Sequence, residues 1–259
     1  MIDSHIHIDS EIYQNEIGID NLLNAAASAG VTRVVAPALH LDSFKALMTI
    51  SEVHNEVYPA AGVHPHEVSS ERCEGLTESL VESLARMTHP LVGETGLEGH
   101  YDFVPMDLQL QSLRSHLDVC KAHGIPIILH CRDAEQLLYN ELKGAGLSAG
   151  GVIHCFTGTW NWAERFLELG FHIGITGIVT FKKSTQVQEV ARSLPIDRIL
   201  VETDGPYLAP SPYRGKTNKP EYIPLIIEKI AQLRDISATE LGARTVENTE
   251  KVFRLTKAQ

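Results

Sequence analysis

A pattern of a short strand and a longer helix recurs along the whole chain, and this pattern constrains the fold more than any single motif does. Runs rich in β-branched residues alternate with amphipathic stretches, so that one strand–helix unit takes about 30 residues. Several helical stretches end in a glycine just before the next run, as at Gly30, Gly124 and Gly170. Glycine suits the left-handed conformation in which many helices end. The predicted strands are residues 1–8, 32–39, 57–63, 90–93, 125–129, 151–153, 171–175 and 199–201.

Eight such units in 259 residues predict a closed (β/α)8 TIM barrel, an α/β fold of about 250 residues. A doubly wound open sheet is the alternative, but such sheets usually carry a glycine-rich phosphate loop, and none occurs here. No linker, sequence repeat or low-complexity tract divides the chain, so we predict a single domain over residues 1–259. The expected helices include residues 20–29, 109–122, 135–144 and 160–169. In a barrel, functional groups should gather at the C-terminal ends of several strands.

Composition excludes some classes of function. The formal net charge of −11 argues against a protein that coats nucleic acid through lysine and arginine, although it is compatible with a nuclease that has a metal centre. No apolar run approaches the roughly 20 residues of a membrane span, and the first residues lack a signal-peptide pattern. We therefore expect a cytoplasmic protein with no membrane contact, and a monomer is the working hypothesis. The four cysteines form no CxxC pair, so we expect reduced thiols without disulfides.

Histidines and carboxylates follow most of the predicted strands. His5 and His7 are two residues apart in the first strand, where alternate side chains point the same way, so the two imidazoles would reach one spot. A lone strand-end histidine is more often a hydrogen-bonding residue than a ligand, but here six strands carry such a group. The groups are His5 and His7, His64 and His66, Glu94, His130, His154, and Asp204. A charge or imidazole buried at a strand end is costly unless it is paired or binds an ion.

Four of these imidazoles and two carboxylates suit two divalent ions about 3.5–4 Å apart, with one carboxylate bridging them. Glu94 is the predicted bridge because its strand lies between the two sides of the barrel that supply the other ligands. The first ion would take His5, His7, Glu94 and Asp204, and the second would take Glu94, His130 and His154. Each ion would keep an open position for water or substrate, which is typical of catalytic rather than structural sites.

These residues also carry a resemblance to a known family. The ordered motifs HxH, GVHPH, VGETGL, HCRDA, HCFTG and ETDGPYLAPSPYRGKTNKP, with the closing NTEKVFRL, are similar to those of the TatD family of metal-dependent deoxyribonucleases, within the amidohydrolase-like barrels. The resemblance implies a (β/α)8 barrel with a dinuclear centre that hydrolyses phosphodiesters. The substrate that the resemblance implies is DNA, either single-stranded DNA or the 3′ ends of DNA strands. The family's ligand positions map onto the same six residues: His5, His7, Glu94, His130, His154 and Asp204.

Three departures from the family pattern are visible. Glu98 stands where the family usually has aspartate, and the following residues 99–102 (GHYD) also differ from typical members. Both changes lie on the loop after the fourth strand, so they bear on substrate preference more than on metal binding. The third departure is His116, where we expect glutamine and which we interpret as surface variation.

The catalytic candidates are Asp204, Glu94 and His64. Two metal ions would activate a water, and Asp204 would orient it and act as general base; either carboxylate could equally be only a ligand. His64 is a candidate for substrate contact or for proton donation to the leaving oxygen. Because Pro65 follows it, capping of a turn is the structural alternative.

Substrate contacts are predicted for Arg132, Arg214 and His66. The two guanidinium groups could clamp phosphates. Lys216 and Lys219 in the same loop as Arg214 are equally well explained as solvated charges. Trp160 and Trp162 could stack on a base, but packing in the core or at the surface explains them at least as well. Asn218 is expected to shape its loop, and Cys131 and Cys155 are expected to pack facing away from the metals.

Two other functions remain open. Amidohydrolase barrels with the same HxH start also cleave amides and lactones, so a lactonase or deacylase is the first alternative. Many of those enzymes bridge their metals with a carboxylated lysine, and Glu94 at that position favours phosphodiester hydrolysis. The second alternative is a non-catalytic metal-binding component of a larger assembly. The ions could be Mg²⁺, Mn²⁺ or Zn²⁺, because the imidazole ligands suit Zn²⁺ or Mn²⁺ whereas the family is usually Mg²⁺-dependent.

Overall fold

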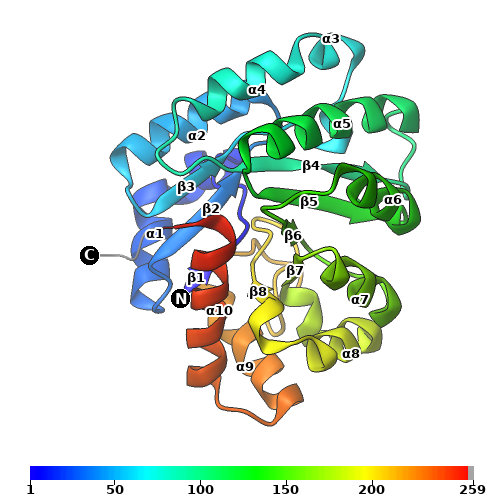
Figure 1. The fold of residues 1–259 in the computed structure, drawn as a ribbon. Helices are drawn as coiled ribbons and strands as arrows, with labels where there is room; N and C mark the ends of the chain where they lie inside the picture. Colours follow the sequence, from blue (N-terminus) through cyan, green and yellow to red (C-terminus); the bar gives the residue numbers. More distant parts are fainter. Residues whose placement is uncertain (256–259) are drawn as a thin grey trace.

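Eight parallel strands form a closed ring in the computed structural model, which describes residues 1–255 (Figure 1). The strands are β1 (Ile2–Asp3), β2 (Arg33–Pro37), β3 (Val57–Ala60), β4 (Val92–Glu98), β5 (Ile127–Arg132), β6 (Gly151–Ile153), β7 (Phe171–Ile175) and β8 (Ile199–Val201). They pair in chain order in two groups, β1 to β3 and β4 to β8. Bridges between Ala61 and Val92 and between Ile6 and Gly205 join the groups, so the ring closes. The predicted (β/α)8 barrel is confirmed.

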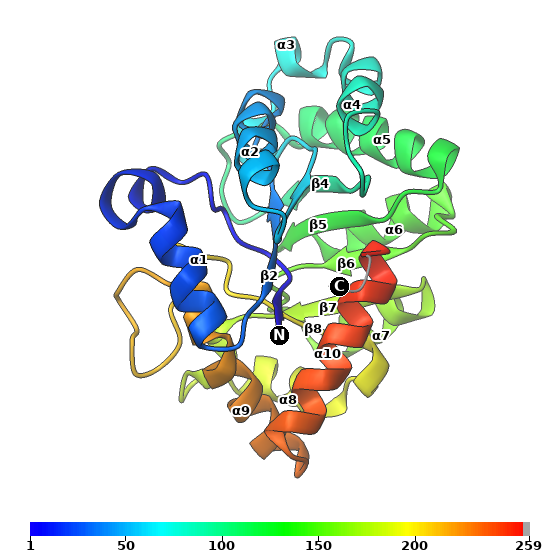
Figure 2. The same cartoon turned by 90° about the vertical axis from the view of Figure 1, so that its left-hand side faces the viewer.

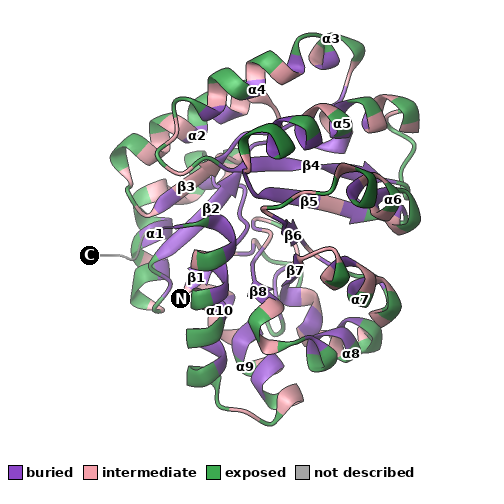
Figure 3. Cartoon of the chain, viewed as in Figure 1, coloured by how far each residue is buried: buried purple, intermediate pink, exposed green. Residues whose placement is uncertain are grey.

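Helices surround the ring on its outside (Figures 1 and 2). They are α1 (Ile19–Ser28), α2 (Leu41–Val53), α3 (Ser70–Cys73), α4 (Leu76–Leu84), α5 (Met106–His123), α6 (Glu135–Ala145), α7 (Trp160–Glu168), α8 (Thr185–Ser193), α9 (Ile223–Arg234) and α10 (Ala238–Phe253). Short helical turns are η1 (Ile12–Ile17), η2 (Pro65–Glu67), η3 (Gly177–Thr180), η4 (Ile196–Arg198) and η5 (Pro220–Tyr222). The strands are buried while the outer faces of the helices are exposed (Figure 3). Within residues 1–255, no helix is both long and apolar enough to cross a membrane.

Several strand boundaries differ from the prediction, and the differences at β4 and β1 concern the site. Strand β4 was expected at residues 90–93 but runs from Val92 to Glu98, because the polar residues Glu94, Thr95 and Glu98 are buried inside the fold rather than exposed after the strand. Strand β1 ends at Asp3, and the chain beyond it continues between its neighbours through the bridge of Ile6 with Gly205 and through a hydrogen bond from the N–H of Ile6 to the carbonyl of Val35. The prediction ended the fourth strand too early, because it assumed that the polar residues Glu94, Thr95 and Glu98 face water.

An apolar cluster fills the N-terminal end of the barrel. It consists of Ile2, Val35, Ala60, Leu91, Ile128, Val152 and Leu200, together with Val252, Phe253 and Leu255 from the end of α10. Burial of each large side chain contributes about 1.5–3 kcal/mol. Side chains two residues later on a strand point in the same direction. His130 follows Ile128 and His154 follows Val152 at this spacing, so the barrel presents both imidazoles inward at its other end.

Candidate metal centre

The carboxylate of Glu94 lies at the centre of a group of buried imidazoles. Its Oε2 atom is 3.3 Å from Nε2 of His5 and 3.7 Å from Nε2 of His7. Oδ1 of Asp204 lies 3.7 Å from the same nitrogen of His5 and 3.6 Å from that of His7. His5, His7 and Asp204 each offer a ligand atom within 4.8 Å of the others, as a cation requires.

The second oxygen of Glu94 faces a different set of imidazoles. Oε1 is 2.7 Å from Nε2 of His154, 3.3 Å from Nδ1 of His130 and 3.5 Å from Nε2 of His64. The structure therefore brings all six predicted ligands together, with Glu94 between two groups of them. That these residues bind metal stays a prediction. His64 also lies in the second group, with Glu94 and His130.

The residues present fit bound cations. Several buried nitrogen and oxygen atoms here have no hydrogen-bond partner among the described residues, and they are Nδ1 and Nε2 of His5, Nδ1 of His7, Nδ1 and Nε2 of His154, and both carboxylate oxygens of Glu94. Leaving buried polar atoms unpartnered costs free energy, and native proteins rarely do so. Cations between the imidazoles and the carboxylates would partner both oxygens of Glu94 and the Nε2 atoms of His5 and His154, which face that carboxylate.

The electrostatics of the two central carboxylates also favour cations. Burial alone would raise the pKa of Glu94, but the surrounding imidazoles, above all His154, hold that pKa well below its ordinary value. Burial likewise acts to raise the pKa of Asp204, and the hydrogen bond and charge of His7 bring it below its ordinary value. Both groups are therefore ionised, and they place two negative charges inside the barrel mouth.

Glu98 lies behind His130 and fixes its orientation. Oε2 of Glu98 is 3.3 Å from Nε2 of His130, while Nδ1 of the same ring faces Glu94. A carboxylate that accepts one ring N–H leaves the other ring nitrogen free to bind a metal. Burial would raise the pKa of Glu98, but hydrogen bonds, first from His130, lower it to about 2, so this carboxylate is ionised.

Glu202 lies in a comparable place beside His154, but at ion-pair rather than hydrogen-bond distance. Its Oε1 lies 3.6 Å from Nδ1 of His154, and the carboxylate accepts hydrogen bonds from Ser4 Oγ and from the backbone N–H of Cys155. Gly174 leaves the space for this carboxylate, since a Cβ atom there would lie 2.5 Å from its oxygens. Two imidazoles of the centre thus each lie beside a buried glutamate, His130 through a hydrogen bond and His154 through a charge contact.

Sequence reasoning identified neither glutamate as a site residue. Glu98 was noted only as a departure beside the site, and Glu202 was not singled out. A signal for Glu202 was present, because it lies two residues after the strand residue Leu200 and so points the same way, into the barrel.

His64 caps the turn, as the structural alternative predicted, and its role toward a substrate stays a prediction. Its Nδ1 accepts a hydrogen bond from the backbone N–H of His66 at 3.1 Å and caps the turn η2, while its Nε2 faces Glu94. Burial lowers the pKa of His64 to about 3, so the ring is neutral at neutral pH. Because Nδ1 is an acceptor, the proton of the neutral ring is on Nε2 and points into the site.

A cavity of about 650 Å³ opens above the centre. Glu94, His64, Asp204 and the predicted substrate contacts Arg132 and His66 all line it. Arg214, by contrast, is exposed and is not among the lining residues; its Cζ atom lies 4.5 Å from the centre of the Phe181 ring. The structure thus brings two of the three predicted substrate contacts to the cavity.

The loop that carries Arg214 is held by a buried asparagine. Asn218 donates from its side chain to the carbonyl of Thr203, and its own carbonyl accepts the hydroxyl of Tyr13 at 2.6 Å. Lys219 forms an ion pair with Glu221 at 3.7 Å. The loop-shaping role predicted for Asn218 agrees with these contacts.

The interpretation of His116 as surface variation is wrong. The side chain is fully buried on the inner face of α5, where Nε2 accepts a hydrogen bond from the N–H of Val63 and Nδ1 donates to the carbonyl of Ser112. A single sequence does not show whether a polar residue on a helix faces the barrel or the solvent. Here the polar ring points inward, where it accepts a hydrogen bond from the backbone N–H of Val63, just after the third strand.

The tryptophans and cysteines near the site pack rather than face the metal ligands. Trp160 and Trp162 are partly buried against the core and are not among the cavity residues. Cys131 belongs to the apolar core, while Cys155 Sγ lies 3.7 Å from the hydroxyl of Thr176; both border the cavity. All four cysteines, which lie within residues 1–255, are free thiols.

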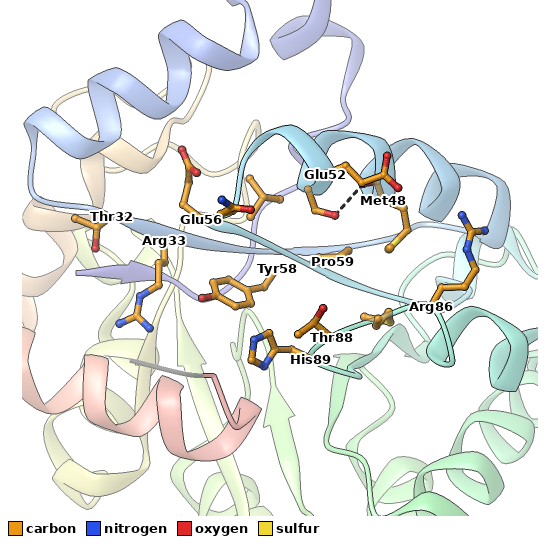
Figure 4. Close-up of a pocket in the computed structure, with 14 residues that line it drawn as sticks. Thr32, Arg33, Met48, Glu52, Glu56, Tyr58, Pro59, Arg86, Thr88 and His89 are labelled. Carbon is orange, nitrogen blue, oxygen red and sulfur yellow. Dashed lines mark hydrogen bonds between the residues drawn. The ribbon is translucent and has the colours of Figure 1, made fainter. Parts of the chain in front are cut away.

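A second cavity, of about 780 Å³, lies at the opposite end of the barrel (Figure 4). Its lining includes Arg33 and Val57, which begin β2 and β3, together with Tyr58, Arg86 and His89. Within the described chain, no cluster of three possible metal ligands lies there. The catalytic candidates are therefore confined to the cavity at the C-terminal ends of the strands.

Comparison with known proteins gives similarity over nearly the whole chain. A family model described as TatD related DNase matches residues 2–254. The chain is 33% identical over 256 residues to YabD of Bacillus subtilis, described as an uncharacterized metal-dependent hydrolase, with 98% of this chain and 99% of YabD covered. It is 33% identical over 263 residues to YcfH of Escherichia coli K12, described in the same words, with 98% and 96% covered. The crystal structure of YjjV, a TatD homolog from Escherichia coli K12, matches with a TM-score of 0.91 at 30% identity, covering 99% of this chain and 98% of that one.

Proposed function

Because this chain belongs to the TatD family of metal-dependent hydrolases, we propose that it is a deoxyribonuclease that removes nucleotides from the 3′ end of DNA. The proposed cofactors are two divalent ions, Mg²⁺, Mn²⁺ or Zn²⁺. The proposed ligands are His5, His7, Glu94, His130, His154 and Asp204.

One observation carries the proposal. The two oxygens of Glu94 face separate groups of imidazoles, with His5 and His7 beside Oε2 and His154 and His130 beside Oε1. A carboxylate between two such groups suits a pair of ions, and paired ions are typical of enzymes that displace oxygen at phosphorus.

Bound ions would stabilise negative charge on a phosphodiester and make water a stronger nucleophile. The residues of the chain would do the remaining work. Asp204 is ionised and 13% of its side chain is accessible, compared with 1% for Glu94, so it can accept a proton from water in the cavity. His64 is neutral with its proton on Nε2, which makes it a hydrogen-bond donor to a phosphoryl oxygen rather than a proton donor. Arg132 at the cavity wall would bind a neighbouring phosphate.

The test uses single-stranded DNA labelled at either its 3′ or its 5′ end. Metal-stripped protein is assayed on gels after addition of Mg²⁺, Mn²⁺ or Zn²⁺, and Glu94→Gln is assayed beside it. We expect stepwise shortening from the 3′ end that requires added metal, and a rate at least roughly 100-fold lower in the variant, because several kcal/mol of transition-state stabilisation are lost.

Glu56→Gln is the matched control, since Glu56 is a glutamate that lines the cavity at the opposite end of the barrel. It should cleave at the wild-type rate. If no metal supports cleavage although the wild-type protein binds two ions, the nuclease proposal fails and small esters, lactones and amides become the substrates to test.

A further inference from the structure

We propose that Tyr101 and Phe103, on the loop after β4, form a stacking site for a nucleobase beside the metal centre. The inference rests on the proposed function and narrows it. It predicts that the preferred substrate is a DNA end whose terminal base is unpaired and free to stack.

The two rings form an exposed aromatic pair. Their centres are 4.9 Å apart and their planes differ by 3°, yet Tyr101 is 41% exposed and Phe103 is 65% exposed. Stacked rings that remain accessible present a π surface on which a flat ligand can stack. Tyr101 lines the same cavity as Glu94.

Contacts connect this pair to the catalytic residues. The ring of His66 lies edge-on to Phe103, with centres 5.1 Å apart, and edge-on to Tyr101 at 5.9 Å. His66 in turn lies 4.8 Å from the ring of His64, which faces Glu94. A base on the aromatic pair would therefore belong to a nucleotide at or next to the reacting phosphate.

The loop that carries the pair is held in place before any ligand binds. Oε1 of Glu98 accepts hydrogen bonds from the backbone N–H groups of His100 at 2.6 Å and Tyr101 at 3.2 Å. The side chain of Gln109 accepts from the N–H of Glu98 and donates to the carbonyl of Val104. A preorganised loop loses little conformational entropy on binding, so the stacking free energy is available for affinity.

Glu98 also joins the loop to the metal centre. While its Oε1 holds the loop, its Oε2 lies 3.3 Å from Nε2 of His130 and 3.4 Å from Nε2 of His66. The glutamate and the residues 99–102, both of which depart from the family pattern, thus form one unit. That unit sets the position of Tyr101 relative to the ligand His130.

The aromatic rings and the nearby guanidinium of Arg132 together suit a nucleotide, which has both a base and a phosphate. Flat aromatic rings stack on every base, so such sites tolerate any sequence. The guanidinium of Arg132 lies 5.0 Å from the centre of the Tyr101 ring and adds a positive charge that can pair with the phosphate of the same nucleotide. A base inside a duplex is already stacked and paired, so the site favours single-stranded ends.

The experiment compares the wild type with the double variant Tyr101→Leu, Phe103→Leu. Calorimetry on Mn²⁺-loaded protein measures the binding of deoxyadenosine 5′-monophosphate and of 2-deoxyribose 5-phosphate, which lacks the base. We expect the wild type to bind the nucleotide roughly 5-fold to 100-fold more tightly than the sugar phosphate, and the double variant to lose this preference. The control is Tyr213→Leu, because Tyr213 stacks on Tyr222 with centres 4.3 Å apart and is not a cavity residue.

A second measurement uses oligonucleotides whose 3′-terminal residue either carries a base or is abasic. The double variant should show a raised KM with little change in kcat on the normal end, and no change on the abasic end. Equal preference for the nucleotide in wild type and double variant would overturn the stacking site, even if the DNA is cleaved. Failure to cleave any DNA, combined with base-dependent binding that requires the two rings, would instead reject the nuclease and keep the stacking site.

Discussion

Replacing His116 by glutamine should make the protein more resistant to acid. The buried ring accepts a hydrogen bond from the N–H of Val63 at 3.1 Å and donates one to the carbonyl of Ser112 at 2.7 Å. Protonation would place a second ring N–H against the N–H of Val63, so the charged form has no partner on that side. A glutamine can accept from the first group with its oxygen and donate to the second with its nitrogen, at every pH.

The magnitude follows from the pKa of His116. Burial lowers this pKa to about 4, compared with about 6.5 in an unfolded chain. Between these values the unfolded chain binds a proton that the folded chain does not, so the free energy of unfolding decreases as the pH falls. The full stability is present above about pH 6.5, and from about pH 7.5 to about pH 5 the loss from this one group is about 2 kcal/mol.

Urea denaturation of metal-stripped protein at these two pH values measures the effect. His64 and His172, whose pKa values burial also lowers, are present in both proteins and cancel in the difference. We expect His116→Gln to lose about 2 kcal/mol less than the wild type on acidification, whereas His123→Gln, at the exposed end of the same helix, should behave like the wild type. An identical pH dependence in His116→Gln and wild type would refute the reasoning.

Three predictions concern the metal centre. Asp204→Asn should lower turnover at least roughly 100-fold, because the proton acceptor is lost while the side-chain shape is kept. The circular dichroism spectrum should be unchanged. Near wild-type turnover would show that Asp204 is not the general base. Glu202→Gln should weaken Mn²⁺ binding by about 10–100-fold in calorimetry, since His154 loses the negative charge that faces its Nδ1, and unchanged affinity would argue against that pairing. Adding Mn²⁺ to metal-stripped protein at about 100 times its Kd should stabilise the fold by about 2.7 kcal/mol, read as a rise in Tm, and Glu94→Gln should gain less; an equal gain would show that the ion binds elsewhere.

The sequence alone determined the architecture and the main candidates for the site. Periodic strands and helices ending in glycine predict the barrel, and Gly124 indeed ends α5 in the left-handed conformation. The two-residue spacing of His5 and His7 and the strand-end places of His130 and His154 bring these residues to one end of any such barrel. These inferences succeeded because each depends on local periodicity, which the chain carries in its own order of residues.

Only the tertiary structure decided the partners of these residues. Contacts across the closed ring place Glu202 beside His154 and let Glu98 hold both His130 and the loop of Tyr101. They also decide how the rings of that loop stack. Strand order and closure bring together side chains up to about half the ring apart, at distances that the spacing along the chain does not encode. A polar residue looks the same in the sequence whether water or a buried partner satisfies it, and the fold alone decides which of the two it meets.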